Sequence, residues 1–100
     1  MRKLVMLAGL SLVATTLLPV LATSQDAPAG ARLYAAQCSA CHGANRAGIP
    51  GTFPALTGVG ERLDEKQIKE KIMKGGGLMP PFTQLSEKDI DDLVAFLKQK

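Results

Sequence analysis

The sequence predicts a small all-α domain with three main helices, built around a group that the chain itself does not supply. Three segments combine helix caps with apolar residues at helical spacing, and they cover residues 27–38, 64–74 and 86–100. No segment shows the alternating pattern of a half-buried strand, and no internal repeat is present. With one Tyr, three Phe and no Trp the core is thin, and a domain this small usually needs a staple such as disulfides or a metal.

The N-terminal segment has the three features of a secretory signal peptide. Arg2 and Lys3 form a charged region, residues 4–18 are almost wholly apolar, and Pro19 precedes small residues that end at Ala22. We therefore expect cleavage after Ala22. An uncleaved membrane anchor is the alternative, because an apolar run of about 20 residues can span a bilayer.

Cleavage divides the chain into a signal peptide, residues 1–22, and one domain, residues 23–100. The full chain has a net charge of +3, but without Arg2 and Lys3 ten Lys and Arg remain against nine Asp and Glu, which leaves +1. Nucleic-acid binding therefore loses its compositional support. Export predicts an oxidising, periplasmic location, or attachment to the outer face of the inner membrane if the segment is not removed.

Residues 38–42, Cys-Ser-Ala-Cys-His, form the most informative motif. They follow the C-x-x-C-H pattern of covalent haem attachment and contain both cysteines and the single histidine of the chain. Two thiols three residues apart lie about one helical turn from each other, which suits thioether bonds from Cys38 and Cys41 to the two vinyl groups of one haem. His42 follows directly and can ligate the iron. We expect one covalently bound haem c.

Three other interpretations of the cysteine pair have less support. A structural zinc site needs four ligands, and the chain has no Cys or His beyond these three. A thioredoxin-like motif expects a preceding strand, and nothing before Cys38 has strand character. A structural disulfide, or a pair of free core thiols, is the simplest alternative.

The first helix is predicted from Ala27 into the cysteine motif. Asp26 can cap its N-terminus, and Pro28 is tolerated in the first turn. Gly43 can end the helix after the motif. Three residues share one face at helical spacing: Gly30, Leu33 and Tyr34.

Residues 43–60 are expected to be loop. Their glycines and prolines exclude long regular structure: Gly43, Gly48, Pro50, Gly51, Pro54, Gly58 and Gly60. Arg46 is a lone charge in this loop and is expected to be solvated.

The second helix begins near Asp64, which forms a capping-box pattern with Gln67. Ile68 and Ile72 lie four residues apart and can face the haem, and the glycines at 75–77 end the helix. The prolines of the following segment, residues 78–82, predict an extended chain.

The third helix has the clearest signals. Ser86 can cap it, with Asp89 three residues later, and Glu87 complements the helix dipole. Phe96 widens its apolar stripe. The stripe itself follows i, i+3, i+4, i+7 spacing: Ile90, Leu93, Val94 and Leu97.

Several of these segments share one resemblance. Before the haem motif, Gly30 and Tyr34 form a pattern of a Gly and an aromatic residue four positions apart. Residues 54–58 follow the pattern P-x-L-x-G, and residues 79–82 read M-P-P-F. A C-terminal helix that crosses the first one is matched by Leu93, Phe96 and Leu97. The chain thus resembles the class I c-type cytochromes, monohaem electron carriers with His and Met as iron ligands. The resemblance implies a small cytochrome c-like fold around one covalently attached haem.

The second iron ligand is expected to be Met79. A thioether opposite the His42 imidazole favours ferrous iron and raises the reduction potential. After signal cleavage only Met73 and Met79 remain, and the glycines before Met79 and the prolines after it allow a close, stiff approach. Met73 lies on the second helix, where Met is usually a gap filler. By resemblance, the Pro54 carbonyl accepts the other imidazole N–H, which sets the orientation of the ring.

The resemblance implies a non-enzymatic electron carrier, either a periplasmic shuttle or the small cytochrome subunit of a respiratory or dehydrogenase complex. Its partners would be an oxidase, a reductase or a dehydrogenase; a membrane is a partner only if the N-terminal segment is uncleaved. The alternative is a haem-based gas sensor or a peroxidase-like enzyme with an open axial position, for which the chain offers no spare His. Four lysines lie on the second helix: Lys66, Lys69, Lys71 and Lys74. They form either a solvated helix face or a weak docking surface for an acidic redox partner.

Overall fold

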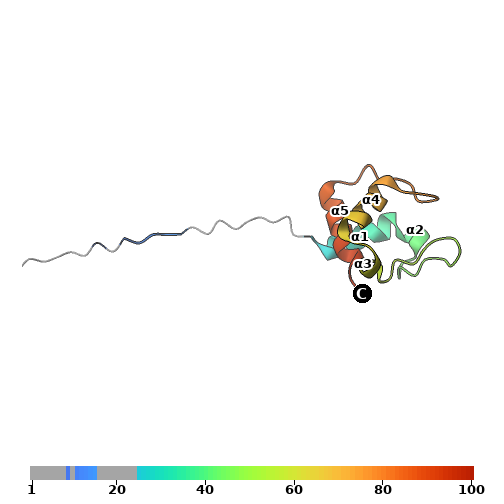
Figure 1. The fold of residues 1–100 in the computed structure, drawn as a ribbon, viewed down its shortest axis with the longest axis horizontal. Helices are drawn as coiled ribbons and strands as arrows, with labels where there is room; N and C mark the ends of the chain where they lie inside the picture. The colour runs from blue at the N-terminus through green and yellow to red at the C-terminus, as the bar shows by residue number, and fades with distance from the viewer. Residues whose placement is uncertain (1–8, 10, 16–24) are drawn as a thin grey trace, which may run out of the picture.

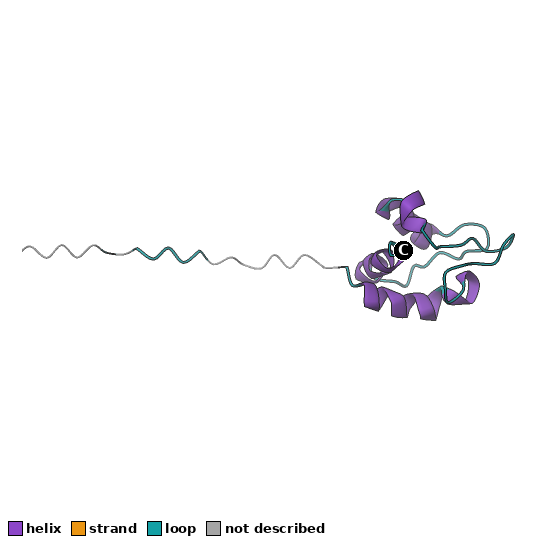
Figure 2. Cartoon of the chain, turned by 90° about the horizontal axis from the view of Figure 1, so that it is seen from below, coloured by secondary structure: helices purple, strands orange, loops and turns teal. Residues whose placement is uncertain are grey.

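The computed structural model describes residues 9, 11–15 and 25–100 (Figure 1). Within residues 25–100 the chain forms helices and loops, and its only β-type pairing is two isolated bridges (Figure 2). Most of the predicted signal peptide, residues 1–22, lies outside the described residues, so its cleavage stays a prediction. In the part of the chain that is described, no helix has the length and apolar character needed to cross a membrane.

Helices α1 and α5 cross and form the centre of the domain, and α4 packs against α5 (Figure 1). The three predicted main helices are confirmed. Two single-turn helices complete the fold, and the five elements are α1 Ala27–Gln37, α2 Ser39–His42, α3 Val59–Arg62, α4 Glu65–Lys74 and α5 Glu87–Leu97.

The predicted helix starts are present in the structure. The Asp26 carboxylate accepts the backbone N–H of Ala29 at 3.1 Å and caps α1. Helices α4 and α5 each begin with a complete capping box, in which the side chains of the cap and the third residue accept each other's backbone N–H. The two pairs are Asp64 with Gln67 and Ser86 with Asp89.

The α1–α5 crossing is close because Gly30 has no side chain. A Cβ at this position would lie 1.9 Å from the Asp92 carbonyl oxygen. The Asp92 side chain is buried and accepts the Asp26 backbone N–H at 2.8 Å and the Lys88 ammonium at 3.0 Å. The hydrogen bond from the Asp26 backbone N–H, followed by that from Lys88, holds the pKa of Asp92 below its ordinary value. The predicted apolar stripe of α5 is buried in the core.

The structure corrects three expectations. The first helix breaks at Cys38, whose φ of −123° is not helical, so the motif forms its own turn, α2. The loop ends before residue 60, because Val59 starts α3; Gly60 is there for close packing against Lys98 and does not break the helix. Leu78 lies in a turn closed by a bridge between Gly76 and Met79, and the extended chain begins only after that turn.

Candidate cofactor-binding site

Two adjoining cavities of about 440 Å³ and about 370 Å³ open between the cysteine motif and the segment that follows α4. They share five lining residues: Cys38, His42, Pro54, Lys71 and Met79. Because Cys38, His42 and Met79 border both cavities, and Cys41 borders the larger one, we treat the two spaces as parts of one cleft. Cavities of this size hold cofactors and drug-sized molecules in other proteins.

The smaller cavity is the inner part of the cleft, and its lining is almost wholly apolar. Ile68 and Ile72, four residues apart on α4, both face it, as the spacing predicted. The other apolar lining residues come from every part of the domain: Tyr34, Leu56, Val59, Leu63, Leu93 and Leu97. An apolar cleft in the middle of a small core fits a large, flat, apolar group such as a porphyrin.

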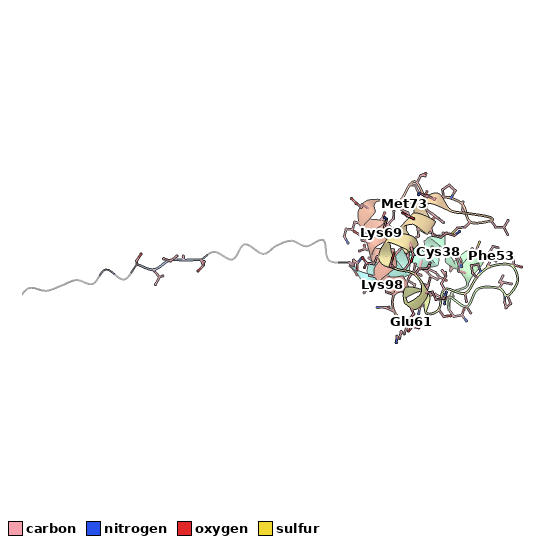
Figure 3. All side chains as sticks on the ribbon, viewed as in Figure 1. Cys38, Phe53, Glu61, Lys69, Met73 and Lys98 are labelled. Carbon is pink, nitrogen blue, oxygen red and sulfur yellow. The ribbon has the colours of Figure 1, made fainter. Side chains whose placement is uncertain are left out.

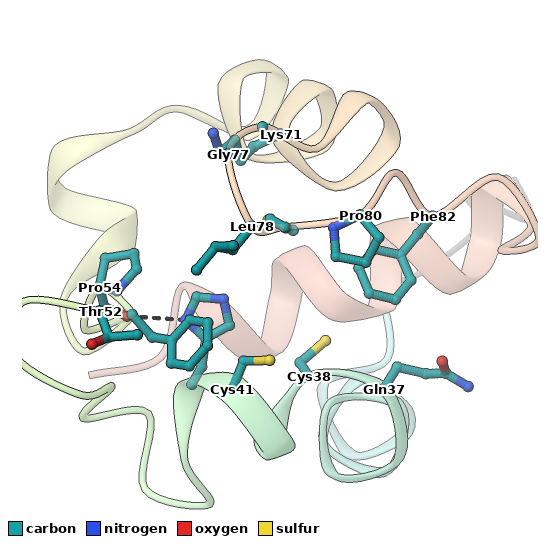
Figure 4. Close-up of a pocket in the computed structure, with 14 residues that line it drawn as sticks. Gln37, Cys38, Cys41, Thr52, Pro54, Lys71, Gly77, Leu78, Pro80 and Phe82 are labelled. Atoms are coloured by element: carbon teal, nitrogen blue, oxygen red, sulfur yellow. Dashed lines mark hydrogen bonds between the residues drawn. The ribbon is translucent and has the colours of Figure 1, made fainter.

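The cysteine motif presents both thiols to this cleft. In Figure 4 Cys38 and Cys41 lie on one side of the cleft, and Leu78 and Pro80 lie on the other. The turn of α2 is held by hydrogen bonds from the Cys41 and His42 backbone N–H groups to the Cys38 carbonyl, at 3.2 and 3.0 Å. The thiols are not joined as a disulfide. Burial, and then the nearby Cys41, raise the pKa of the Cys38 thiol to about 11.

The His42 imidazole is held from its far side. Its Nδ1 atom lies 2.9 Å from the Pro54 carbonyl oxygen, as the dashed line in Figure 4 shows. Because a carbonyl oxygen can only accept, this hydrogen bond places a proton on Nδ1, and in the neutral imidazole Nε2 then keeps the lone pair that a metal ion needs. This is the geometry of a metal-ligating histidine with a fixed hydrogen-bond partner. The role of Pro54 toward a haem ligand stays a prediction.

The two candidate methionines differ in position. Met79 is half-buried and borders both cavities. Its segment is fixed by hydrogen bonds between Gly76 and Met79 and by the Phe82 N–H, which donates to the Ile72 carbonyl at 2.9 Å. Met73, labelled in Figure 3, is 44% exposed and lines neither cavity. Position therefore favours Met79 as the second ligand.

Arg46 has a role that the sequence did not reveal. It was expected to be solvated, but its guanidinium donates to the Gln99 carbonyl at 2.8 Å and to the Phe96 carbonyl at 3.4 Å. It also lies over the Phe96 ring, 5.1 Å from the ring centroid. Tyr34 is buried in the core, and its hydroxyl also donates to the Gly43 carbonyl at 2.6 Å and holds the end of the motif. Neither contact is local in sequence, so no sequence pattern indicated it.

The residues of the cleft fit a covalent haem better than the alternative groups. Two unlinked thiols, an imidazole with a free Nε2 and a thioether surround one apolar space. Within residues 25–100 no group of three or more His, Cys, Asp or Glu side chains is arranged to hold a metal ion by itself, which gives a zinc site no support.

Comparison with known proteins gives consistent matches. The family model described as "Cytochrome C oxidase, cbb3-type, subunit III" matches residues 25–97. Cytochrome c-550 of Bacillus subtilis is 42% identical over 67 residues, which are 67% of this chain and 53% of that protein. Cytochrome c6 of Picosynechococcus sp. is 32% identical over 108 residues, 97% of this chain and 92% of that protein.

Solved structures match as well. Cytochrome c6 from the diatom Phaeodactylum tricornutum superposes with a TM-score of 0.61 at 29% identity, over 72% of this chain and 90% of the other. The chain spans only part of some relatives, 53% of cytochrome c-550 and 59% of cytochrome c-552 from Thermus thermophilus.

Proposed function

The chain belongs to the c-type cytochrome family and binds one haem c covalently, and on this premise we propose that it carries single electrons between redox proteins outside the cytoplasm. It acts either as a free periplasmic shuttle or as the small cytochrome subunit of a respiratory or dehydrogenase complex. Its partners are an oxidase, a reductase or a dehydrogenase. The signal peptide, residues 1–22, accounts for export.

One observation carries this proposal: His42 and Met79 face one cleft from different segments of the chain. The haem supplies an iron that gains and loses one electron. His42 is fixed in orientation by the Pro54 carbonyl, and Met79 by the Gly76 turn and the prolines that follow it. Two ligands that are each held in place would leave little room for geometric change, and the apolar lining of the smaller cavity would give the group little contact with water.

The sensor and enzyme alternatives find no further support in the cleft. A peroxidase-like reaction needs an acid–base side chain beside an open iron position. Among the described residues, no Asp or Glu lines either cavity, and the single histidine is already engaged with Pro54. We therefore propose that the protein is not an enzyme.

Ligand binding by the reduced protein tests this proposal. If His42 and Met79 both hold the iron, carbon monoxide would have to displace Met79 and would bind slowly and incompletely, while small redox mediators would still exchange electrons rapidly. Stopped-flow spectroscopy at neutral pH measures both rates. Rapid, stoichiometric carbon monoxide binding by the unmutated protein contradicts the carrier and favours the sensor or peroxidase.

The four lysines of α4 are not equivalent. Lys69 pairs with Asp91 of α5, and Lys71 lines both cavities. Lys66 and Lys74 are exposed, line neither cavity and, among the described residues, have no carboxylate within ion-pair distance. We propose that Lys66 and Lys74, together with Lys71 at the cleft, attract acidic partners to the α4 side of the domain.

Charge steering predicts a salt-dependent rate. The anionic mediator ferricyanide should oxidise the reduced protein more slowly as ionic strength rises, because exposed charges are screened beyond about 8–10 Å at physiological salt. The Lys66→Gln/Lys74→Gln variant should be oxidised by ferricyanide roughly threefold more slowly at low salt. This is a modest effect, since charge steering can raise association rates ~10–1,000-fold. Lys98→Gln, which removes a charge paired with Glu65, is the control. A flat salt profile for the unmutated protein would leave these lysines as a solvated face.

A further inference from the structure

We propose that Arg46 is a positioning residue, which fixes the orientation of the His42 imidazole by holding the backbone of residues 54–57 in place. The inference rests on the proposed ligation of haem by His42. Arg46 does not line either cavity, so it acts through the backbone and not by contact with the cofactor.

The side chain of Arg46 is anchored on the C-terminal end of α5. Its Nη1 group donates to the Gln99 and Phe96 carbonyls at 2.8 and 3.4 Å, and its planar group lies over the Phe96 ring. The Phe96 carbonyl also accepts the Gln99 backbone N–H at 3.1 Å, and the helix dipole is negative at this end of α5. A guanidinium suits this position because it brings a positive charge and a rigid, planar set of donors. The loop that follows the haem motif is thereby tied to the central helix pair.

The backbone of Arg46 holds the other side of the connection. Its carbonyl oxygen accepts the N–H groups of Leu56 at 2.7 Å and Thr57 at 3.3 Å. To do so the residue adopts a φ of +62°, in the left-handed region that residues other than glycine seldom occupy. Among the described non-glycine residues, Arg46 alone has a positive φ. Such a conformation persists where the surroundings over-determine it, and here both the side chain and the carbonyl are engaged.

This held segment contains the acceptor of the His42 hydrogen bond. Pro54, two residues before Leu56, places its carbonyl oxygen 2.9 Å from Nδ1. Gly48 closes the opposite side: its N–H donates to the His42 carbonyl at 2.7 Å, and a Cβ there would lie 2.7 Å from the Pro54 oxygen. The Pro54 carbonyl is thus confined between Gly48 and a segment that the Arg46 carbonyl holds together with Arg62, whose guanidinium donates to the Ala55 and Thr57 carbonyls at 3.0 Å. A shift of that segment moves the acceptor away from the imidazole.

The consequence for the cofactor follows from the basicity of the imidazole. A hydrogen bond from Nδ1–H to a fixed acceptor makes Nε2 a stronger donor to the metal. A stronger donor favours the ferric state and lowers the reduction potential. Arg46 therefore keeps the potential lower than it would be with a loosely held ring, and it slows the exchange of the Nδ1 proton with solvent.

The test uses the holoprotein with Arg46→Lys, which keeps the charge and loses the planar, multiple-donor group. We expect the His42 Nδ1–H exchange rate, measured by NMR, to rise roughly tenfold, as the loss of about one hydrogen bond allows. The reduction potential should shift upward. Arg46→Gly, which removes the side-chain anchor and tolerates the positive φ, should show the same faster exchange. Its upward shift in potential should be smaller, because the lost positive charge favours ferric iron.

Lys98→Gln is the control, because it removes a charge and an ion pair at the same end of α5 and touches neither residue 46 nor residues 54–57. It should leave the exchange rate unchanged, and it should not raise the potential, because the loss of an exposed positive charge can only shift the potential slightly downward. The inference would be overturned if Arg46→Lys and Arg46→Gly kept the exchange rate and the potential of the unmutated protein, even if their melting temperatures were lower. A failure of the proposed function is recognised separately, because the unmutated holoprotein would then lack a His–Met spectrum.

Discussion

Replacing Met79 by alanine is expected to open the iron of the reduced protein to carbon monoxide. Met79 borders both cavities, and its turn is fixed by Gly76 and by the prolines that follow. Without the thioether the second axial position has no protein ligand, so carbon monoxide affinity should rise at least about tenfold, and the potential should fall because thioether ligation favours ferrous iron. Optical spectra and voltammetry measure both changes.

Met73 provides the matched control for this substitution. Met73→Leu nearly conserves volume at a half-exposed position outside the cleft, so it should cost less than about 1.5 kcal/mol of stability and leave the spectrum unchanged. If Met73→Leu abolished the absorption band that a methionine gives with ferric iron, and Met79→Ala did not, the assignment of the second ligand would be reversed.

Removal of haem attachment is expected to abolish cooperative folding. An empty inner cavity of about 370 Å³ would cost, at about 24 cal/mol per Å³, up to about 9 kcal/mol. That is an upper bound because the cleft opens to water, but it is comparable to the ~5–15 kcal/mol by which whole domains are stable. The Cys38→Ala/Cys41→Ala variant, purified without haem, should therefore show reduced helicity by circular dichroism and no sharp melting transition.

Free haem added to that variant provides the complementary measurement. His42 and Met79 remain, so haem should restore part of the helicity, but denaturation in acid should release it. A sharp, two-state melt of the haem-free variant would show that the helices alone form a stable core, and the haem would then not be the staple of this fold.

The local features of the fold were predictable from the sequence because their causes are local. The capping residues Asp26, Asp64 and Ser86 act within three positions of themselves, and the apolar stripe of α5 follows the helical period. The C-x-x-C-H motif is equally local, since its chemistry depends on a fixed spacing. These signals identified the three main helices and the residues that the cleft brings together.

The features that the sequence did not reveal depend on contacts between distant segments. Gly60 resembles a helix breaker, but it lies within α3, where a Cβ would come within 3.0 Å of the Lys98 Cα. Arg46 resembles a solvated loop charge, but its partners Phe96 and Gln99 lie 50 and 53 residues away. The choice between Met73 and Met79 also depends on contacts between distant segments. The sequence alone could not show that Met79 borders the cleft and that Met73 lies outside it.

The mass of the intact, unmutated protein tests the central claim most directly. Purified from a host that matures c-type cytochromes and denatured before measurement, the chain should carry the added mass of one haem, held through Cys38 and Cys41. A start near Thr23 would show that residues 1–22 are removed, whereas a start at Met1 would support a membrane anchor. A chain without the mass of a haem, from a host competent in haem attachment, would contradict the account.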